Sequence, residues 1–325
     1  MKFAFIIDPV ARLDPSHDTS VAIMEAAQTL GHEVYITQAN QLGVIRGRAY
    51  AWLQPITMKP VVLRAFPGGS RWVSEPDWYQ LGESKWCPLE AMDAVFMRSD
   101  PPVTVPYLYV TYILDYIDRS ITQVINSPSG LRAANEKMYA LQFADAIPET
   151  IVSADKQIIR EAVERWGAGV LKPLGGKAGE GILFLEGGDR NFNSMIEVST
   201  HQGKEPVMVQ TYLPEAKDGD KRVILLNGEP IGAVNRVPTG QEFRGNMAVG
   251  GRSDKTALTE RDLEICQQVG PVLRRDGLIF VGIDIIGGYL TEVNVTSPTG
   301  IREIDRLDDV RLAHQVVDWI EKAAQ

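Results

Sequence analysis

Short apolar runs and amphipathic stretches alternate along the first part of the chain. Apolar residues dominate positions 3–7, recur at helical spacing over 19–30, and return over 33–36 after Gly31. This order predicts a strand, a helix and a second strand, and such a βαβ unit implies a parallel sheet. The pattern predicts three further elements of this unit: a strand over 94–97, a helix over 106–119 and a strand over 121–125.

Two segments interrupt this pattern. Residues 65–90 are polar, rich in Trp and Pro, and show little periodicity, which predicts a loop. Aromatic side chains at this density would not stay solvated, so we expect a partner surface there rather than a linker. Residues 126–130 read Asn-Ser-Pro-Ser-Gly, a run of turn-forming residues that predicts the first domain boundary.

Beyond this boundary the pattern predicts two α+β units. The first is a small lid, made of a helix over 131–143, a strand over 150–153, a helix over 155–166 and strands over 169–172 and 182–185. The second contains strands over 207–210, 222–227 and 229–235, a helix over 260–276, strands over 279–286 and 290–295, and a terminal helix.

Length and charge narrow the classes of function. A chain of 325 residues exceeds what one hydrophobic core organises, so two or three packed units are expected. The formal charge of -9 argues against nucleic acid as a partner, because no extended basic surface could release counterions. No apolar stretch approaches the length of a membrane span, and the apolar run before Asp8 is too short for a secretory signal. We therefore expect a cytoplasmic protein that does not bind a membrane.

Cysteine and histidine offer little chemistry. Cys87 and Cys266 lie far apart without metal-binding spacing, so we expect packing residues rather than a disulfide or a zinc site. No GxSxG motif occurs, and no cysteine lies near a His/Asn framework. Each histidine is expected to be a surface or capping residue, at positions 17, 32, 201 and 314.

Acidic and amide side chains gather on the last two predicted strands. Glu292 and Asn294 are two residues apart and therefore share one face of their strand. A two-residue turn between the strands would pair Asp284 with Thr291, whereas a three-residue turn would set Asp284 opposite Glu292. The second arrangement brings three oxygen ligands together, which suits Mg²⁺ that holds nucleotide phosphates. The alternative is a sheet with a solvated polar face.

A glycine-rich loop follows the predicted strand that carries Lys172. Glycine lets backbone N–H groups approach a phosphate closely, and the lysine adds a positive charge. The loop lacks the GK[ST] ending of a Walker A sequence and the GxGxxG spacing of a Rossmann site. The alternative is a plain turn. The candidate phosphate-binding positions are Lys172, Gly175, Gly176, Lys177, Gly179 and Gly181.

Basic residues flank a second glycine-rich loop. Arginine recognises carboxylates and phosphates bidentately, so the loop predicts a site for an anionic small molecule, with a solvated loop as the alternative. Its polar members are Arg236, Arg244, Asn246 and Arg252. Elsewhere, Arg98 and Asp100 follow the strand over 94–97, at a carboxyl edge where open α/β sheets bind ligands.

Short motifs spread over nearly the whole chain carry a family resemblance. They are Ile7-Asp8-Pro9, Asp18-Thr19-Ser20, Met97–Pro102, Thr111–Leu114, Asn135-Glu136-Lys137, Leu171-Lys172-Pro173, Tyr212-Leu213-Pro214, Lys217–Arg222, Arg244-Gly245-Asn246, Gly250-Gly251-Arg252, and the block Gly277–Gly288 with Thr291–Thr299. The last block is the most specific, because it couples metal ligands to a substrate loop. With these motifs the chain closely resembles the bacterial glutathione synthetases of the ATP-grasp superfamily.

This resemblance implies an α/β protein with the ATP-grasp fold in three domains. These would be an N-terminal open parallel α/β domain over 1–126, a small α+β lid over 127–205 and a C-terminal α+β domain over 206–325. The implied reaction joins γ-glutamylcysteine and glycine to glutathione through an acyl phosphate, with ATP as co-substrate and release of ADP and phosphate. Mg²⁺ is the implied metal, with Mn²⁺ as the alternative, and the family suggests a homo-oligomer, a homotetramer by analogy.

The resemblance also implies roles for individual residues. Asp284, Glu292 and Asn294 match the Mg²⁺ ligands. Arg222, Arg236 and Arg244 match the catalytic cations, with Arg236 or Arg244 stabilising the tetrahedral oxyanion. The nucleotide set adds Lys137, Gln210, Thr211, Tyr212, Leu213 and Asp220 to the phosphate-binding positions above. The substrate set is Asp18, Arg98, Asp100, Arg244, Asn246, Arg252, Ser297 and Thr299.

The chain departs from the family pattern in one loop and at one further position, and two other functions stay open. The chain reads Gly175-Gly176-Lys177-Ala178-Gly179 where the family has Asp-Gly-Met-Gly-Gly, and Thr211 stands where asparagine is usual. Another ATP-grasp carboxylate–amine ligase would share the metal ligands but differ in the arginine loop over 236–252. A catalytically silent nucleotide-binding module is the second alternative, and the intact carboxylates Asp284 and Glu292 speak against it.

Overall fold

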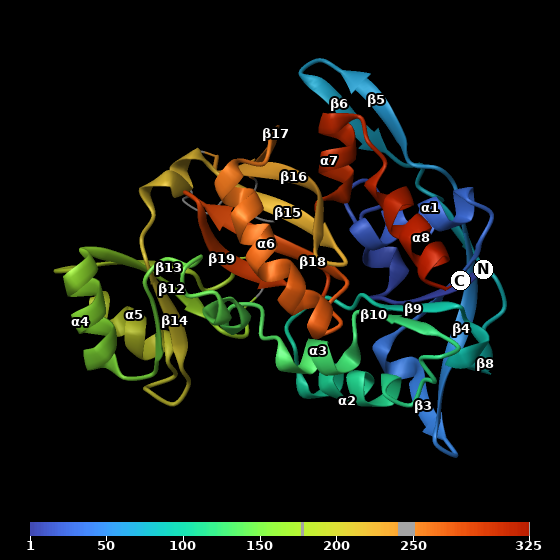
Figure 1. Ribbon diagram of the computed structural model, residues 1–325, viewed down its shortest axis with the longest axis horizontal. Helices are drawn as coiled ribbons and strands as arrows, with labels where there is room; N and C mark the ends of the chain where they lie inside the picture. The colour runs from blue at the N-terminus through green and yellow to red at the C-terminus, as the bar shows by residue number, and fades with distance from the viewer. Residues whose placement is uncertain (177–178, 240–250, 325) are drawn as a thin grey trace.

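Three main β-sheets organise the protein, and a separate two-stranded hairpin accompanies them (Figure 1). The computed structural model describes residues 1–176, 179–239 and 251–324. An eight-stranded, a four-stranded and a five-stranded sheet follow one another along the chain, and the five-stranded sheet lies between the other two. The mixed helices and sheets confirm the predicted α/β class.

The first sheet contains the predicted parallel unit. Its parallel strands have the order β10-β9-β1-β2, and β1, the first of them in sequence, is buried from Phe3 to Ile6 because it is covered on both faces. The elements are β1 (Lys2–Ile6), α1 (Thr19–Thr29), β2 (Glu33–Thr37), β9 (Ala94–Met97), α2 (Val105–Leu114) and β10 (Gln123–Ile125).

An antiparallel extension continues this sheet, so the prediction of a loop over 65–90 was wrong. Trp52 lies opposite Trp86 on a neighbouring strand, and Tyr50 stacks on the same ring. These cross-strand aromatic pairs stabilise strands too short to show a period of two. The added strands are β3 (Leu42–Ile45), β4 (Arg48–Met58), β7 (Tyr79–Leu81) and β8 (Lys85–Pro88), while β5 (Val62–Phe66) and β6 (Gly69–Val73) form the separate hairpin.

The helix predicted over 131–143 is broken in the middle. Helix α3 (Pro128–Ala133) ends early, and a 3-10 turn, η4 (Met138–Gln142), starts after a gap. The Asn135 side chain accepts hydrogen bonds from the backbone N–H groups of Lys137 (3.2 Å) and Met138 (3.1 Å). Asparagine thereby supplies the local acceptor that competes with helical hydrogen bonds.

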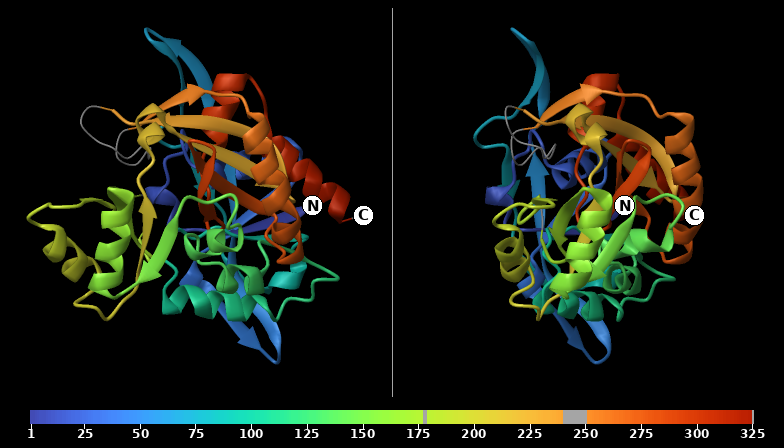
Figure 2. Two further views of the ribbon diagram at one scale, coloured as in Figure 1. Left: turned by 60° about the vertical axis from the view of Figure 1, so that its left-hand side comes forward. Right: turned by 90° about the vertical axis from the view of Figure 1, so that its left-hand side faces the viewer.

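The four-stranded sheet forms the small α+β unit. Its strands have the order β11-β14-β12-β13, all antiparallel, and helices α4 and α5 cover the face turned away from the five-stranded sheet (Figure 2). Helix α5 was not predicted. The bounds are β11 (Thr150–Ser153), α4 (Lys156–Trp166), β12 (Ala168–Pro173), β13 (Leu183–Glu186), α5 (Phe192–Ser199) and β14 (Val207–Thr211).

The five-stranded sheet follows, and the chain then returns to the first sheet. Two terminal helices form where one was predicted, because Asp309 adopts a left-handed conformation (φ 55°) between them. Both helices pack near α1. The elements are η5 (Pro214–Asp218), β15 (Asp220–Leu226), β16 (Glu229–Val237), β17 (Arg252–Lys255), α6 (Glu260–Arg275), β18 (Phe280–Ile286), β19 (Tyr289–Asn294), α7 (Ile301–Asp308) and α8 (Leu312–Ala323).

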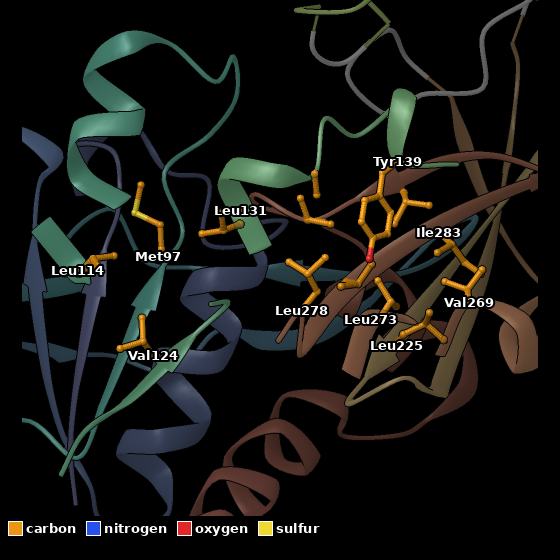
Figure 3. Packing of buried hydrophobic residues seen from close by; sticks show 14 of the residues in the cluster. Met97, Leu114, Val124, Leu131, Tyr139, Leu225, Val269, Leu273, Leu278 and Ile283 are labelled. Carbon is orange, nitrogen blue, oxygen red and sulfur yellow. The ribbon is translucent and has the colours of Figure 1, made fainter. Parts of the chain in front are cut away.

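One hydrophobic cluster joins the first and third sheets. It extends from Met97 and Val124 through Leu131 to Leu278 and Ile283 (Figure 3). Because α3 carries Leu131, the segment between the two sheets is itself part of the core and fixes the position of one sheet relative to the other. None of the helices in the described ranges combines the length and the hydropathy needed to cross a membrane.

Candidate active site

A cavity of about 430 Å³ opens between the four-stranded and five-stranded sheets. This volume lies within the usual range for small-molecule sites. Strands β12 and β14 line one side, strands β15, β16, β18 and β19 line the other, and loops of the first sheet add His17, Asp100 and Pro101. All three sheets therefore contribute to one site.

The turn between β18 and β19 follows neither predicted geometry alone. It contains two residues, since Ile286 pairs with Tyr289 and Ile285 with Leu290. A bulge after this point leaves Thr291 unpaired and sets Asp284 opposite Glu292. The Thr291 hydroxyl donates to the Asp284 carbonyl oxygen (3.2 Å). The bulge therefore combines the two-residue turn with the pairing that brings both carboxylates to the cavity.

Two buried arginines hold Asp284. Arg222 donates to both carboxylate oxygens through Nε and Nη2, and Arg236 Nη2 lies 2.9 Å from Asp284 Oδ2. Burial alone would raise the pKa of Asp284, but the two guanidinium groups outweigh burial and hold that pKa well below its usual range. Asp284 is therefore ionised at neutral pH.

Asp220 shares Arg236 with Asp284 but has the opposite shift. Its Oδ2 accepts from Arg236 Nη2, while its Oδ1 and Arg236 Nε are buried without a partner in the described part of the chain. Burial raises the pKa of Asp220 to about 6, because Arg236 only partly compensates for lost hydration and Asp284 repels the charge. Unsatisfied polar atoms at a cavity wall favour a polar ligand there.

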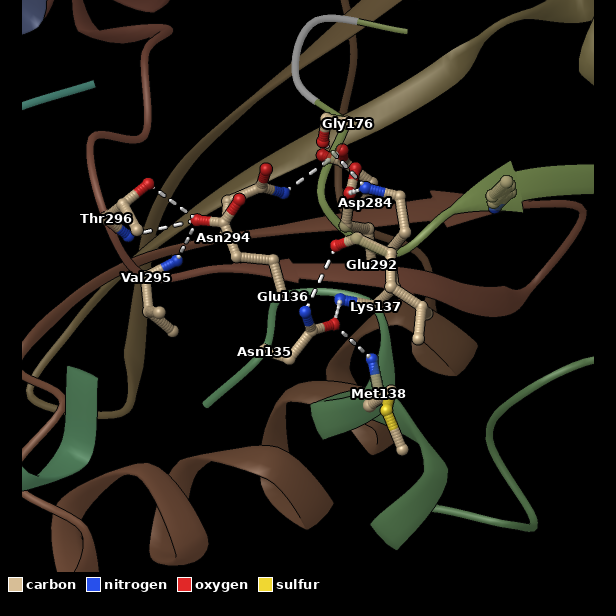
Figure 4. A network of polar contacts seen from close by, with 12 residues as sticks. Asn135, Glu136, Lys137, Met138, Gly176, Asp284, Glu292, Asn294, Val295 and Thr296 are labelled. Atoms are coloured by element: carbon tan, nitrogen blue, oxygen red, sulfur yellow. Dashed lines mark hydrogen bonds and ion pairs between the residues drawn. The ribbon is translucent and has the colours of Figure 1, made fainter. Parts of the chain in front are cut away.

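The helix breaks around Asn135, and the break places Lys137 at the cavity wall. Lys137 Nζ lies 3.1 Å from Glu292 Oε1 and donates to the carbonyl oxygen of Gly176 (3.0 Å), as Figure 4 shows. Its neighbour Glu136 accepts from the backbone N–H groups of Val295 (2.9 Å) and Thr296 (3.0 Å). These contacts connect the glycine-rich loop to the end of β19. A continuous helix would have turned one of the two side chains away.

A second lysine lies on β12. The half-buried Lys172 donates from Nζ to Gln210 Oε1 (2.6 Å), and Gln210 Nε2 donates to the Thr150 hydroxyl (3.1 Å). Burial lowers the pKa of Lys172, despite the nearby carboxylate of Glu292. A nearby polyphosphate would favour the charged lysine and reverse this effect.

Two carboxylates and an amide form the candidate metal site. Asn294 Nδ2 lies 3.2 Å from Asp284 Oδ2, and Glu292 projects from the same face of β19 (Figure 4). Their oxygen atoms are hard ligands of the kind that Mg²⁺ prefers, and they face the cavity. Among the described residues, no three His, Cys, Asp or Glu side chains gather in a metal-binding arrangement. Hard oxygen donors of this kind are typical of Mg²⁺ shared with a phosphate.

The cavity unites most of the predicted site residues. Those that line it are Lys137, Lys172, Gly176, Gly179, Gln210, Thr211, Tyr212, Leu213, Asp220, Arg222, Arg236, Asp100, Ser297, Thr299, Asp284, Glu292 and Asn294. Lys177, Arg244 and Asn246 lie outside the described residues.

Five predicted residues do not line the cavity. Arg98 is buried behind it and donates to Pro298 O (2.9 Å), which fixes the loop beside the cavity, and Asp18 caps helix α1. Arg252 is exposed and pairs with Asp254. Gly175 and Gly181 belong to the glycine-rich loop, where Gly181 (φ 71°) packs on Pro173.

Among the lining residues that the sequence interpretation did not predict are Glu136 and His17. The position of Glu136 between two motif residues, Asn135 and Lys137, was a usable signal. His17 was expected to be a surface or capping residue, and no sequence pattern places it at a cavity.

Lys172 on β12 and Lys137 just before η4 face carboxylates of the five-stranded sheet across the cavity, an arrangement that fits an ATP-grasp ligase. Two family models agree: "Prokaryotic glutathione synthetase, N-terminal domain" matches residues 1–132, and the ATP-grasp domain of the same family matches 136–309. The chain therefore belongs to the prokaryotic glutathione synthetase family.

Curated relatives and solved structures agree with this assignment. A glutathione synthetase of Nostoc sp. is 67% identical over 100% of this chain and 99% of its own, and one of Synechocystis sp. is 63% identical over 99% of each. The D-cycloserine synthetase DcsG has a similar fold, with a TM-score of 0.66 at 13% identity over 99% of each chain. So does the ATP-grasp ligase PsnB, solved with Mg and ADP, with a TM-score of 0.62 at 17% identity over 99% of this chain and 98% of its own.

Proposed function

We infer that the chain catalyses the ATP-dependent ligation of γ-glutamylcysteine and glycine to glutathione, with release of ADP and phosphate. The observation that carries this inference is a family match over nearly the full length, combined with a cavity whose walls bear the implied residues. Family membership also favours these substrates over those of another carboxylate–amine ligase.

The reaction would proceed in two transfers. The cysteinyl carboxylate attacks the γ-phosphorus of ATP, which forms an acyl phosphate and releases ADP. The neutral amine of glycine then attacks the acyl carbon and phosphate leaves, while the amine gives up its proton. Lys137, Lys172 and Arg222 supply positive charge along the cavity, so the protein mainly orients the reactants and stabilises negative charge.

Asp284, Glu292 and Asn294 would hold Mg²⁺, with Mn²⁺ as the alternative ion. An ion bound there neutralises charge on the phosphates. Arg222 would act through its neighbours. It orients Asp284 and also donates to the carbonyl oxygen of Thr299 (3.2 Å) in the loop beside the peptide substrate. It thereby couples the metal ligand to the substrate loop.

We further propose that the division into units 1–126, 127–205 and 206–325 is functional. The four-stranded sheet, to which the middle unit contributes three strands and the last unit contributes β14, would cover the nucleotide, and the first sheet would receive the peptide. Assembly into a homo-oligomer remains a prediction.

The test is ADP release from ATP over a panel of dipeptides and amines. We expect γ-glutamylcysteine with glycine to give the highest kcat/KM, and glutathione to form in equal amount to ADP. A different dipeptide or amine with a higher kcat/KM would show another carboxylate–amine ligase. Absence of ADP release with every pair would contradict ligase activity.

A further inference from the structure

His17 is a cavity residue to which no role has been assigned. It belongs to a hydrogen-bonded turn, because its backbone N–H donates to Asp14 O (3.0 Å) and Asp14 Oδ1 accepts from the Ser16 backbone (2.9 Å). The next residue, Asp18, caps helix α1. The turn and the cap together fix the backbone that carries the imidazole at the cavity wall.

A buried carboxylate holds the His17 ring. His17 Nδ1 pairs with Glu303 Oε1; the Glu303 side chain is 9% exposed and the His17 side chain 37%. Glu303 lies in the first turn of α7, where the helix dipole favours negative charge, and α7 packs near α1. No residue of the described part pairs with His17 Nε2, so this atom can donate to a ligand.

Asp100 offers an anionic partner for a substrate ammonium. It is exposed, lines the cavity together with Pro101 and the substrate loop Ser297–Thr299, and acts electrostatically on Asp18, the residue after His17. Strand β14, which carries the predicted adenine contacts, lies on the opposite side of the five-stranded sheet from α1 (Figure 1). The His17 region, just before α1, therefore lies away from the predicted adenine site.

The chemistry of the peptide substrate fits this pair of charges. In γ-glutamylcysteine the cysteinyl carboxylate reacts at the phosphates, so the glutamyl α-carboxylate and α-ammonium occupy the far end. We propose that His17 donates from Nε2 to the glutamyl α-carboxylate, that Asp100 binds the α-ammonium, and that Glu303 is a positioning residue that keeps the imidazole charged. This proposal rests on the proposed function and assigns the specificity for the γ-glutamyl group to the first sheet.

The charge on His17 depends on pH in a defined direction. Its hydrogen bond to Glu303 raises the pKa of His17 against the opposing effect of burial, and Asp14 and Asp18 raise it further. Asp100 also faces this region, and Arg98 lies behind it. His17 is charged below its raised pKa, so the KM for the peptide should rise as the pH increases through that value.

The test uses wild type and His17→Gln with three peptides that share an α-aminobutyrate residue in place of cysteine, so that no thiol titrates. The first carries the γ-glutamyl group, the second 4-aminobutanoyl, which lacks the α-carboxylate, and the third glutaryl, which lacks the α-ammonium. We expect His17→Gln to raise the KM about 10-fold or more for the γ-glutamyl and glutaryl peptides, and less than about 2-fold for the 4-aminobutanoyl peptide. Equal effects on all three peptides would overturn the proposal.

Three further variants sharpen the result. Asp100→Asn should show the reverse selectivity, with a large KM effect on the 4-aminobutanoyl peptide and a small one on the glutaryl peptide. His17→Lys should restore the KM and keep it constant between pH 6 and about 8.5, because lysine titrates near 10.4. Glu303→Gln should shift the rise in KM to lower pH. An unchanged pH profile in Glu303→Gln would contradict the positioning role.

Two controls test whether the KM effect is specific to His17 and to the peptide. His201→Gln removes an exposed histidine that pairs with Glu205 (3.0 Å) and does not line the cavity, so it should change no KM. The KM for glycine is measured in parallel, and a rise for glycine instead of the peptide would assign His17 to the other carboxylate. ADP release by wild type tests the proposed function separately, because that activity can persist when the His17 effect is absent.

Discussion

Asp284 and Glu292 lie opposite each other in the candidate metal site but differ in their surroundings. The Asp284 side chain is 4% exposed and pairs with two arginines, whereas Glu292 is 23% exposed and, among the described residues, pairs only with Lys137. Replacing each by its amide removes one negative charge from the same site. The two substitutions should therefore affect activity alike and stability differently.

The expected magnitudes follow from these contacts. Asp284→Asn removes a negative charge that balances the buried positive charges of Arg222 and Arg236. Breaking a buried ion pair in this way costs about 3–5 kcal/mol of unfolding free energy. Glu292→Gln leaves Lys137 its bond to Gly176 and its access to the cavity, so the cost should be about 1 kcal/mol or less. A metal ion contributes several kcal/mol of charge stabilisation, so either variant should lower kcat about 100-fold or more.

The assays are urea unfolding without ligands and ADP release at saturating substrates. Asp276→Asn is the matched control, because Asp276 is also 23% exposed, pairs with Arg275 and does not line the cavity. It should keep kcat within about 2-fold of wild type. Two results would refute the reasoning: unfolding free energies of Asp284→Asn and Glu292→Gln within about 1 kcal/mol of each other, or near-normal turnover by Glu292→Gln.

Two other groups of residues give further predictions. Lys172→Met should raise the KM for ATP about 10-fold or more without loss of thermal stability, because burial already penalises the lysine charge. Bound ATP should increase the lowered pKa of Lys172. ATP binding somewhat below pH 10.5 should therefore take up protons in wild type but not in Lys172→Met. Calorimetry in two buffers can measure this proton uptake. The double variant Cys87→Ser, Cys266→Ser should keep most of kcat, since burial raises the pKa of Cys266 to about 12, and should cost about 1 kcal/mol at the buried site. Loss of turnover in a folded double variant would instead indicate a covalent thiol step.

Sequence periodicity predicted the regular elements well where local pattern and tertiary context agree. The strands β9 and β11 begin and end at the predicted residues, and the bounds of α4 and α6 differ by one residue each. The strands of 65–90 have only three to five residues, too few to show alternation, and β8 is stabilised by the packing of Trp86 against aromatic side chains of β4.

The candidate site was predictable in composition but not in geometry. Lys137 and the metal ligands were identified from motifs, yet a helix was expected where Asn135 breaks the chain and delivers Lys137 to the cavity. Arg98, predicted as a substrate ligand, is buried and donates to the carbonyl oxygen of Pro298. Such contacts join residues about 200 positions apart, and no local pattern encodes them.

The bulge at Thr291 explains why both turn geometries considered for the last hairpin were partly right. A two-residue turn gives the tightest connection between β18 and β19, but its regular register would pair Asp284 with Thr291 and direct Glu292 to the other face. One extra residue on β19 reverses the facing of every side chain beyond it, which brings Glu292 and Asn294 to the cavity while Leu290 stays in the core. Deleting Thr291 should therefore give a regular hairpin that still pairs Asp284 with Glu292 and Gly282 with Asn294, so the variant should keep most of its activity. A folded deletion variant without activity would show that the bulge does more than set the facing of these ligands.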